Sequence, residues 1–149
     1  MSLTVVNSKG MTLGIGDGED PEVFETIGGI TDMPNISPSK SVKDRTSLND
    51  SIRHYGHGIE EPPSFTLSIF WNPDDQQQTA LDTAYTSETE DNYLITCPDD
   101  PATTYTFKAI VTNRPSIPYG GIDADLMFDV TFQLIENDDG AVITKTPLT

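Results

Sequence analysis

The segment of residues 63–81 constrains the fold most, because it has the pattern of a β-strand that runs directly into an α-helix. In its first half, apolar side chains alternate with Ser and Thr, which is typical of a strand with one buried face. Asn72 then suits the N-cap and Pro73 the first position of a helix, which we expect to run from Asp74 to about Ser87. The strand side chains expected to be buried are Phe65, Leu67, Ile69 and Trp71.

The cleanest alternation of apolar and polar residues lies at residues 125–134, and it predicts a strand with one buried face and one face in water. The side chains expected inside are Leu126, Phe128, Val130, Phe132 and Leu134, and those expected outside are Asp125, Met127, Asp129, Thr131 and Gln133. Further strands are expected at residues 23–27, 30–36, 93–97 and 105–112, and residues 11–15 form a short apolar run. The sequence therefore predicts a mainly β fold of two packed antiparallel sheets, a sandwich or barrel, with one flanking α-helix.

The 149 residues fit one domain with a modest core, and three polar segments stand apart within it. Ser, Asn, Gly and charged residues dominate residues 37–62 without a regular period, which predicts a loop far longer than the usual ~4–6 residues. Loops of that length are usually functional or disordered. We also expect a flexible N-terminal arm at about residues 1–10 and a polar C-terminal tail at residues 137–149.

Charge is distributed unevenly along the chain. The formal net charge of −16, from 24 acidic and 8 basic side chains, argues against binding nucleic acid through its phosphates and against docking on an anionic membrane. Residues 40–53 nevertheless hold four basic side chains against two acidic ones, a formal +2 that leaves −18 on the rest of the chain. This favours contact with an acidic surface of another copy, although an ordinary solvated loop would look the same. The four basic residues are Lys40, Lys43, Arg45 and Arg53.

His54 and His57 are the only histidines, with two residues between them in the same polar segment. A zinc site needs further Cys or His ligands at suitable spacing, so two loop histidines are favoured over a metal centre. Cys97 is the only cysteine and cannot form an internal disulfide. Its place at the end of a predicted strand favours a packed or partly exposed thiol over a nucleophile.

Two groups of acidic residues match functional patterns only in part. Asp17, Glu19 and Asp20 lie in a glycine-containing turn but do not match an EF-hand, so a solvated turn is favoured and weak divalent-cation binding is the minor alternative. Asp123 and Asp125 form an Asp-x-Asp pair, which is too short to be specific. The chain has no P-loop, dinucleotide fingerprint or Gly-x-Ser-x-Gly. We therefore expect neither an enzyme nor a bound cofactor.

No apolar run approaches the ~20 residues that span a bilayer. Residues 1–7 also lack the basic and apolar blocks of a signal peptide. We expect a protein that is made and kept in a cytoplasm and does not bind membranes.

The order and spacing of these features resemble the major tail-tube proteins of long, non-contractile-tailed bacteriophages. The resemblance covers roughly residues 20–136. It is carried by Ser64–Ser68, Trp71, Pro73, Gln76–Gln78, Ala80–Leu81, the strands at residues 93–96 and 105–107, and the segment Ile30–Ile36 with the long polar loop after it. It implies two packed sheets flanked by one helix, six copies in a ring, and rings stacked into a hollow tube for DNA. The resemblance also implies a fold like that of the ring-forming tube protein of type VI secretion.

On this resemblance we expect a structural virion protein of the phage tail, assembled in the host cytoplasm. Its partners would be further copies of itself, together with tape-measure and tail-terminator proteins, and DNA would pass through without specific binding. An acidic lumen would repel DNA phosphates, and we expect Asp125 and Asp129 to face it. The residues expected in the loop that contacts other subunits are Lys40, Lys43, Arg45, Arg53, His54 and His57.

Three alternatives remain open from the sequence. A tail-terminator or completion protein, or a type VI secretion-tube protein, would have the same fold. A small β-sandwich that binds carbohydrate or calcium would need an exposed aromatic platform, for which Tyr55 and Trp71 are the only obvious residues, and Trp71 is expected to be buried. A hydrolase with Asp123 or Asp125 as its general acid or base is the third and least favoured alternative.

Overall fold

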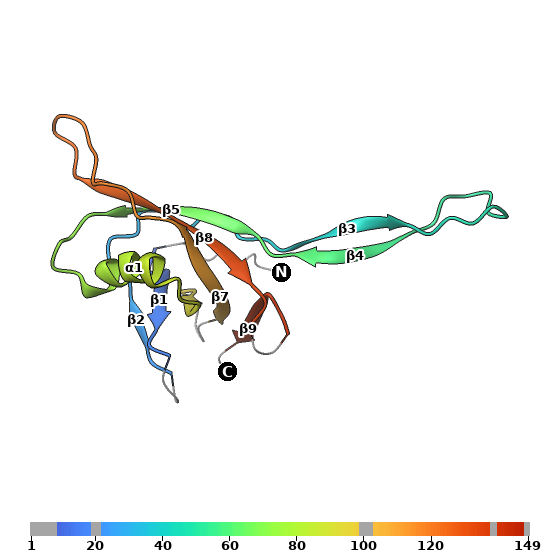
Figure 1. The fold of residues 1–149 in the computed structure, drawn as a ribbon, viewed down its shortest axis with the longest axis horizontal. Helices are drawn as coiled ribbons and strands as arrows, with labels where there is room; N and C mark the ends of the chain where they lie inside the picture. The colour runs from blue at the N-terminus through green and yellow to red at the C-terminus, as the bar shows by residue number, and fades with distance from the viewer. Residues whose placement is uncertain (1–8, 19–21, 99–102, 138–139, 148–149) are drawn as a thin grey trace, which may run out of the picture.

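The structure is a computed structural model, and it describes residues 9–18, 22–98, 103–137 and 140–147. Nine strands and one helix occur in these ranges (Figure 1). They are β1 (Thr12–Gly16), β2 (Phe24–Thr26), β3 (Ser39–Asp44), β4 (Tyr55–Glu61), β5 (Ser64–Phe70), α1 (Gln76–Ser87), β6 (Asp91–Thr96), β7 (Thr103–Asn113), β8 (Met127–Ile135) and β9 (Ile143–Pro147). The predicted fold class is confirmed: the protein is mainly β, with antiparallel sheets and one helix.

Seven strands form one antiparallel sheet in the order β2-β1-β6-β7-β8-β5, with β9 also paired to β7. The long strand β7 offers one edge to two partners, because residues 103–107 pair with β9 and residues 108–113 pair with β8. Strands β3 and β4 form a separate two-stranded sheet that projects from the body (Figure 1). Within the described chain, the seven-stranded sheet curls without closing into a barrel.

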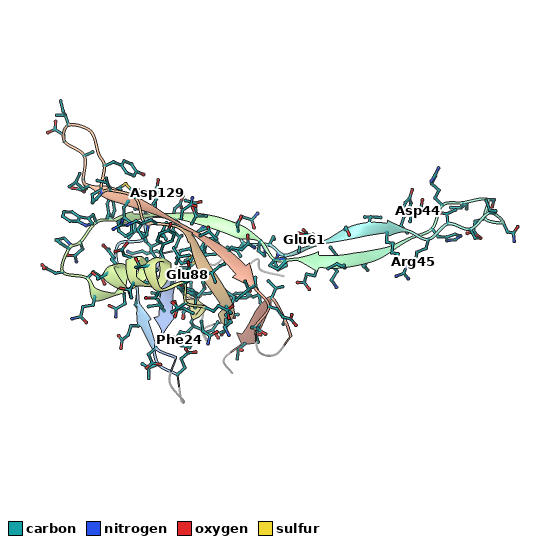
Figure 2. The ribbon with its side chains drawn as sticks, in the orientation of Figure 1. Phe24, Asp44, Arg45, Glu61, Glu88 and Asp129 are labelled. Atoms are coloured by element: carbon teal, nitrogen blue, oxygen red, sulfur yellow. The ribbon has the colours of Figure 1, made fainter. Side chains whose placement is uncertain are left out.

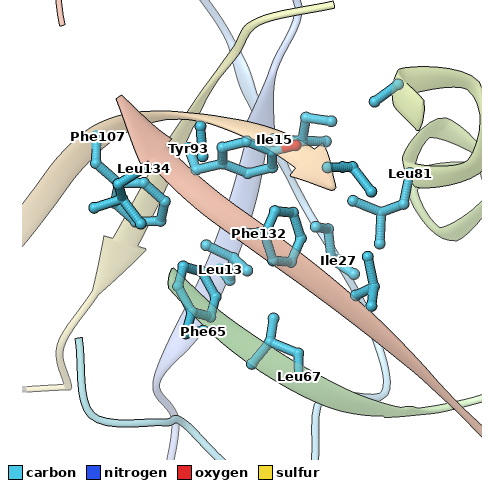
Figure 3. Close-up of a cluster of buried hydrophobic side chains, with 14 of the residues drawn as sticks. Leu13, Ile15, Ile27, Phe65, Leu67, Leu81, Tyr93, Phe107, Phe132 and Leu134 are labelled. Carbon is cyan, nitrogen blue, oxygen red and sulfur yellow. The ribbon is translucent and has the colours of Figure 1, made fainter. Parts of the chain in front are cut away.

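The curl is visible in the packing of four aromatic rings inside the sheet (Figure 3). Tyr93 on β6 and Phe132 on β8 have their ring centroids 5.1 Å apart although β7 lies between their strands. Phe65 on β5 is likewise 5.9 Å from Phe107 on β7, across β8. Rings two strands apart in a flat sheet would be about 10 Å apart, because neighbouring strands are ~4.8 Å apart. The inner faces of the strands therefore converge on a single core.

The two ends of the curled sheet approach each other beside β5. The N–H of Phe70 donates to the carbonyl of Gly29 over 2.8 Å, and Ile30 forms an isolated bridge with Ile69. Gly29 has a φ of +84°, and a Cβ there would lie 2.7 Å from the Phe70 carbonyl oxygen, so only glycine allows this approach.

The predicted alternation is confirmed within β5 and β8 and fails just beyond their paired ends. The inward residues of both strands are buried, but Trp71 and Leu126, which were expected inside, are each 44% exposed. The β5–β8 ladder ends at the pair of Phe70 and Met127, and beyond it a single hydrogen bond, from the N–H of Trp71 to the carbonyl of Leu126 over 2.9 Å, still joins the two segments. The expectation that Trp71 is buried was therefore wrong.

The helix ends where expected but begins later. Asp75 is the N-cap, and its carboxylate also accepts a hydrogen bond from the N–H of Gly28 over 3.2 Å. Asn72 and Pro73, expected at the N-cap and the first helical position, precede the helix instead. Several residues here can cap a helix, and the contact with Gly28, distant in sequence, favours Asp75.

Gln78 joins α1 to two other parts of the fold. Its side chain is buried, its amide nitrogen donates to the carbonyls of Gly28 (3.0 Å) and Phe70 (2.9 Å), and its amide oxygen accepts from the N–H of Asn72 (2.9 Å). One side chain thus satisfies three backbone groups at the junction of helix and sheet.

Two predicted loose segments are partly strands. The loop expected at residues 37–62 contains β3 and β4, and the tail expected at residues 137–149 contains β9, next to the buried Val142. A ribbon exposed on both faces has no buried side to produce an apolar period, which is why β3 and β4 left no signal. Of the expected N-terminal arm, residues 1–8 lie outside the described ranges. The single-domain organisation stays a prediction.

We predict that Gln78→Glu destabilises the protein by ~2–3 kcal/mol, because the variant loses both N–H donors and brings a carboxylate against two carbonyl oxygens. Urea denaturation followed by circular dichroism measures the effect. Gln76→Glu, at an exposed position of the same helix, is the matched control and should change stability by less than ~0.5 kcal/mol. Equal unfolding midpoints for the two variants would contradict the role assigned to Gln78.

Candidate functional site

The projecting ribbon of β3 and β4, residues 39–61, is called the arm below. It carries five large apolar side chains that are between 62% and 105% exposed. They are Val42, Leu48, Ile52, Tyr55 and Ile59. A ribbon without a second layer buries them against nothing in the part of the chain that the structure describes. Clustered exposed apolar side chains of this kind mark interaction surfaces.

The two faces of the arm differ in chemistry. Val42 lies opposite His57 on one face, and Lys43 lies opposite Gly56 on the other. The side chain of Arg45 covers Gly56, since a Cβ there would lie 2.7 Å from the Arg45 Nε. One face is therefore polar and basic, and the other carries apolar residues.

The far end of the arm, which Figure 2 marks by Asp44 and Arg45, is held by local contacts. Arg53 pairs with Asp44 over 3.3 Å, and His54 lies 3.6 Å from Asp50. Hydrogen bonds from Thr46 hold the pKa of Asp44 below its ordinary value. Asp44 and Asp50, the two acidic residues among residues 40–53, thus both contact basic side chains of the arm itself.

The root of the arm is fixed to the body. The side-chain amide of Gln133 on β8 donates to the carbonyls of Pro62 (3.0 Å) and Pro63 (3.3 Å). The N–H of Leu134 also donates to Pro63 over 3.0 Å. These bonds set the direction in which the arm leaves β5.

All six residues predicted for the inter-subunit loop are exposed on the arm: Lys40, Lys43, Arg45, Arg53, His54 and His57. The structure thus brings them onto one projection, but it does not test their role. In the described ranges, no group of three or more Asp, Glu, His or Cys side chains could hold a metal ion. Glu19 and Asp20, weighed as ligands, lie outside those ranges.

Asp125 and Asp129 do not share a strand face as predicted. Asp129 lies on β8, and its carboxylate accepts hydrogen bonds from the hydroxyls of Ser68 (2.8 Å) and Tyr119 (2.9 Å). Asp125 is exposed in the loop before β8, which begins only at Met127. The alternation of the strand was extended too far in the sequence interpretation. Asp129 ties the loop of residues 114–126 to β5 and β8.

A groove lies between the start of α1 and residues 114–118, with a volume of about 580 Å³. We call it the α1 groove. Its apolar lining consists of Trp71, Pro73, Pro115, Ile117, Pro118 and Phe128. An exposed ion pair of Asp82 and Arg114, 3.3 Å apart, forms part of its wall. Sequence reasoning missed the groove because Trp71 was assigned to the core and residues 114–118 show no period. The only feature of the sequence that could have indicated this groove is the apolar Ile117 between Pro115 and Pro118.

The helix of the described chain is neither long enough nor apolar enough to cross a bilayer.

No protein-family model matches the sequence, and no curated protein matches it either. The fold, in contrast, matches solved structures over nearly the whole chain. A chain in the sheath/tube terminator of an extracellular contractile injection system, PVC, superposes with a TM-score of 0.72 at 10% identity, covering 98% of this chain and 99% of that one.

Two further matches come from tails. A chain in the tail of an empty gene transfer agent particle, refined with C6 symmetry, gives a TM-score of 0.63 at 17% identity, covering 90% of this chain and 95% of that one. A chain of the SPP1 tail tube gives a TM-score of 0.60 at 12% identity, covering 97% of this chain and 80% of that one. The chain therefore has a fold found in tail and tube assemblies. Its restriction to long non-contractile tails stays a prediction, because components of contractile systems match as well.

We predict that Asp129→Asn lowers the pKa of Tyr119. The hydrogen bond to the Asp129 carboxylate, with desolvation and that charge adding to it, raises the Tyr119 pKa above its ordinary value. Removing the charge takes away the penalty on the tyrosinate. Difference ultraviolet titration measures the change, and the same substitution in a Tyr119→Phe background is the control. Identical titration curves with and without Asp129→Asn would rule out the contact.

Proposed function

We propose that the protein is a structural subunit of a phage-type tail tube, in which copies of the chain form rings of six and the rings stack into a hollow tube that DNA traverses. One observation carries the proposal: a fold found in tail and tube assemblies presents a fixed arm whose apolar side chains nothing in the described chain buries. The C6 symmetry of the matching tail supports six copies per ring. We also infer that the chain is not an enzyme.

Sheet edges support ring formation. Among the described residues, the seven-stranded sheet ends in β2 and β5, which each have one strand partner, and the other edge of β5 is bonded only near its end, by residues 29–31. Edge strands invite pairing with another chain, and closure of a symmetric ring satisfies them without open-ended growth in the plane. We propose that neighbouring copies pair at these edges. Tape-measure and tail-terminator proteins would be further partners in the virion tail, after assembly in the host cytoplasm.

The arm supports contact between copies. Its exposed apolar residues would provide the attraction between copies. Its basic residues 40–53, with a formal charge of +2, would be attracted to the rest of a neighbouring copy, which carries a formal charge of −18. Exposed ion pairs contribute only ~0–1 kcal/mol each, so charge would orient the subunits while apolar burial holds them.

A tube-terminator role is the second candidate, and the match to a chain from a sheath/tube terminator assembly favours it. Such a protein would form single rings without long polymers. Negative-stain imaging at rising concentration separates the two, because long tubes support the tube subunit and isolated rings support the terminator.

We predict that Val42→Asp together with Ile59→Asp leaves the protein folded but unable to assemble. Both side chains are more than 70% exposed, so the fold should tolerate them, whereas a buried contact with another copy should not. Light scattering measures assembly, and circular dichroism checks the fold. Thr86→Asp, exposed on α1, is the control and should assemble normally. Unchanged assembly of the arm variant would refute the arm's role.

A second prediction concerns the lumen, where we propose that Asp125 and Asp129 contribute negative charge. Six copies carry a formal −96, six times −16, and an acidic wall repels DNA phosphates. Asp125→Lys, at the exposed position, should slow DNA ejection in a virion that carries the variant while tubes still form. Asp32→Lys, at an exposed position of another segment, is the control. Ejection at the normal rate from Asp125→Lys virions would exclude Asp125 from the lumen.

A further inference from the structure

We propose that the tip of the arm, residues 46–53, docks in the α1 groove of a second copy of this chain. The inference rests on the proposed self-assembly and names the surface that receives the arm. It starts from two unpartnered apolar surfaces on the same chain.

The arm and the groove lie at opposite ends of β5. The arm enters β5 through Pro62 and Pro63, whereas Trp71 and Pro73 of the groove follow its last residue, Phe70. Seven residues of strand span ~20 Å or more. Because the arm also points away from α1 (Figure 1), a copy cannot place its own tip in its own groove.

This placement makes the contact head-to-tail. A surface at one end of a protomer that binds a different surface at the other end produces a closed ring or a growing filament. The bonds between Gln133 and the root of the arm keep the arm pointing in one direction, so every copy presents its tip in the same way.

The chemistry of the two surfaces agrees. Leu48 and Ile52 are the apolar residues of the tip. The side chain of Leu48 is fully exposed, and that of Ile52 is 74% exposed. In the groove, Trp71 and Ile117 are exposed as well, at 44% and 87%. A volume of about 580 Å³ lies within the ~300–1,000 Å³ typical of sites that bury a ligand. Docking would remove both apolar sets from water at once.

Charge favours the same partner. Lys43 and Arg45 have no carboxylate within ion-pair distance in the described part of the chain. The groove rim has Asp82, paired with Arg114, and Asp74 is exposed next to Pro73. Since the body as a whole is strongly acidic, a basic arm is attracted to another copy at long range.

Cross-linking between different chains tests the proposal. Both proteins carry Cys97→Ser. One also carries Leu48→Cys and a long tag, and the other carries Ile117→Cys and a short tag, so that a mixed dimer can be told from the two homodimers by its size. The two proteins are mixed, assembled and oxidised. We expect a disulfide-linked heterodimer. The control replaces Ile117→Cys by Thr86→Cys on the exposed side of α1 and should give no such band. Each mixture is also imaged by negative stain.

The images separate failure of this inference from failure of the proposed function. Tubes or rings without a link between Leu48→Cys and Ile117→Cys would mean that the tip docks elsewhere, which overturns the inference and leaves assembly standing. Equal linking to Thr86→Cys would also overturn it. Absence of any assembly would refute both.

Discussion

The packing of Phe65, Tyr93, Phe107 and Phe132 is the contact on which the rest of the structure depends. These rings come from β5, β6, β7 and β8 and meet across intervening strands, so the sheet must curl to bring them together. Gln78 then fixes α1 over the open side, between the end of β5 and the segment after β2. The core buries one face of β5 and of β8, and no residue of β3 or β4 belongs to it.

The arm lies outside this core. β3 and β4 leave the body as a ribbon with both faces in water. Gln133 holds the direction of the ribbon, and the ion pair of Asp44 and Arg53 joins its two sides near the far end. Within the described residues, nothing buries the arm's apolar side chains. The α1 groove, at the other end of β5, is an apolar surface of the same kind. A chain with two such surfaces at opposite ends is suited to repeated association with itself.

How far the sequence predicted the structure depended on burial. β5 and β8 could be found because one face of each is buried, and the alternation failed at Trp71 and Leu126, where the ladder ends. The arm gave no period because neither face is covered. The N-cap could not be chosen from local sequence, since a contact with distant Gly28 favours Asp75. The basic residues of the arm were found from charge alone, whereas the groove is assembled from segments without a pattern.

Hydrogen exchange of the arm, measured on the monomer and on the assembled protein, tests the central claim most directly. If other copies bury the arm, amides of residues 45–54, which connect β3 and β4, should exchange quickly in the monomer and slowly in the assembly. Amides of β7, inside the sheet, should be protected in both states and serve as the internal reference. Equal exchange of residues 45–54 in the two states would contradict the account.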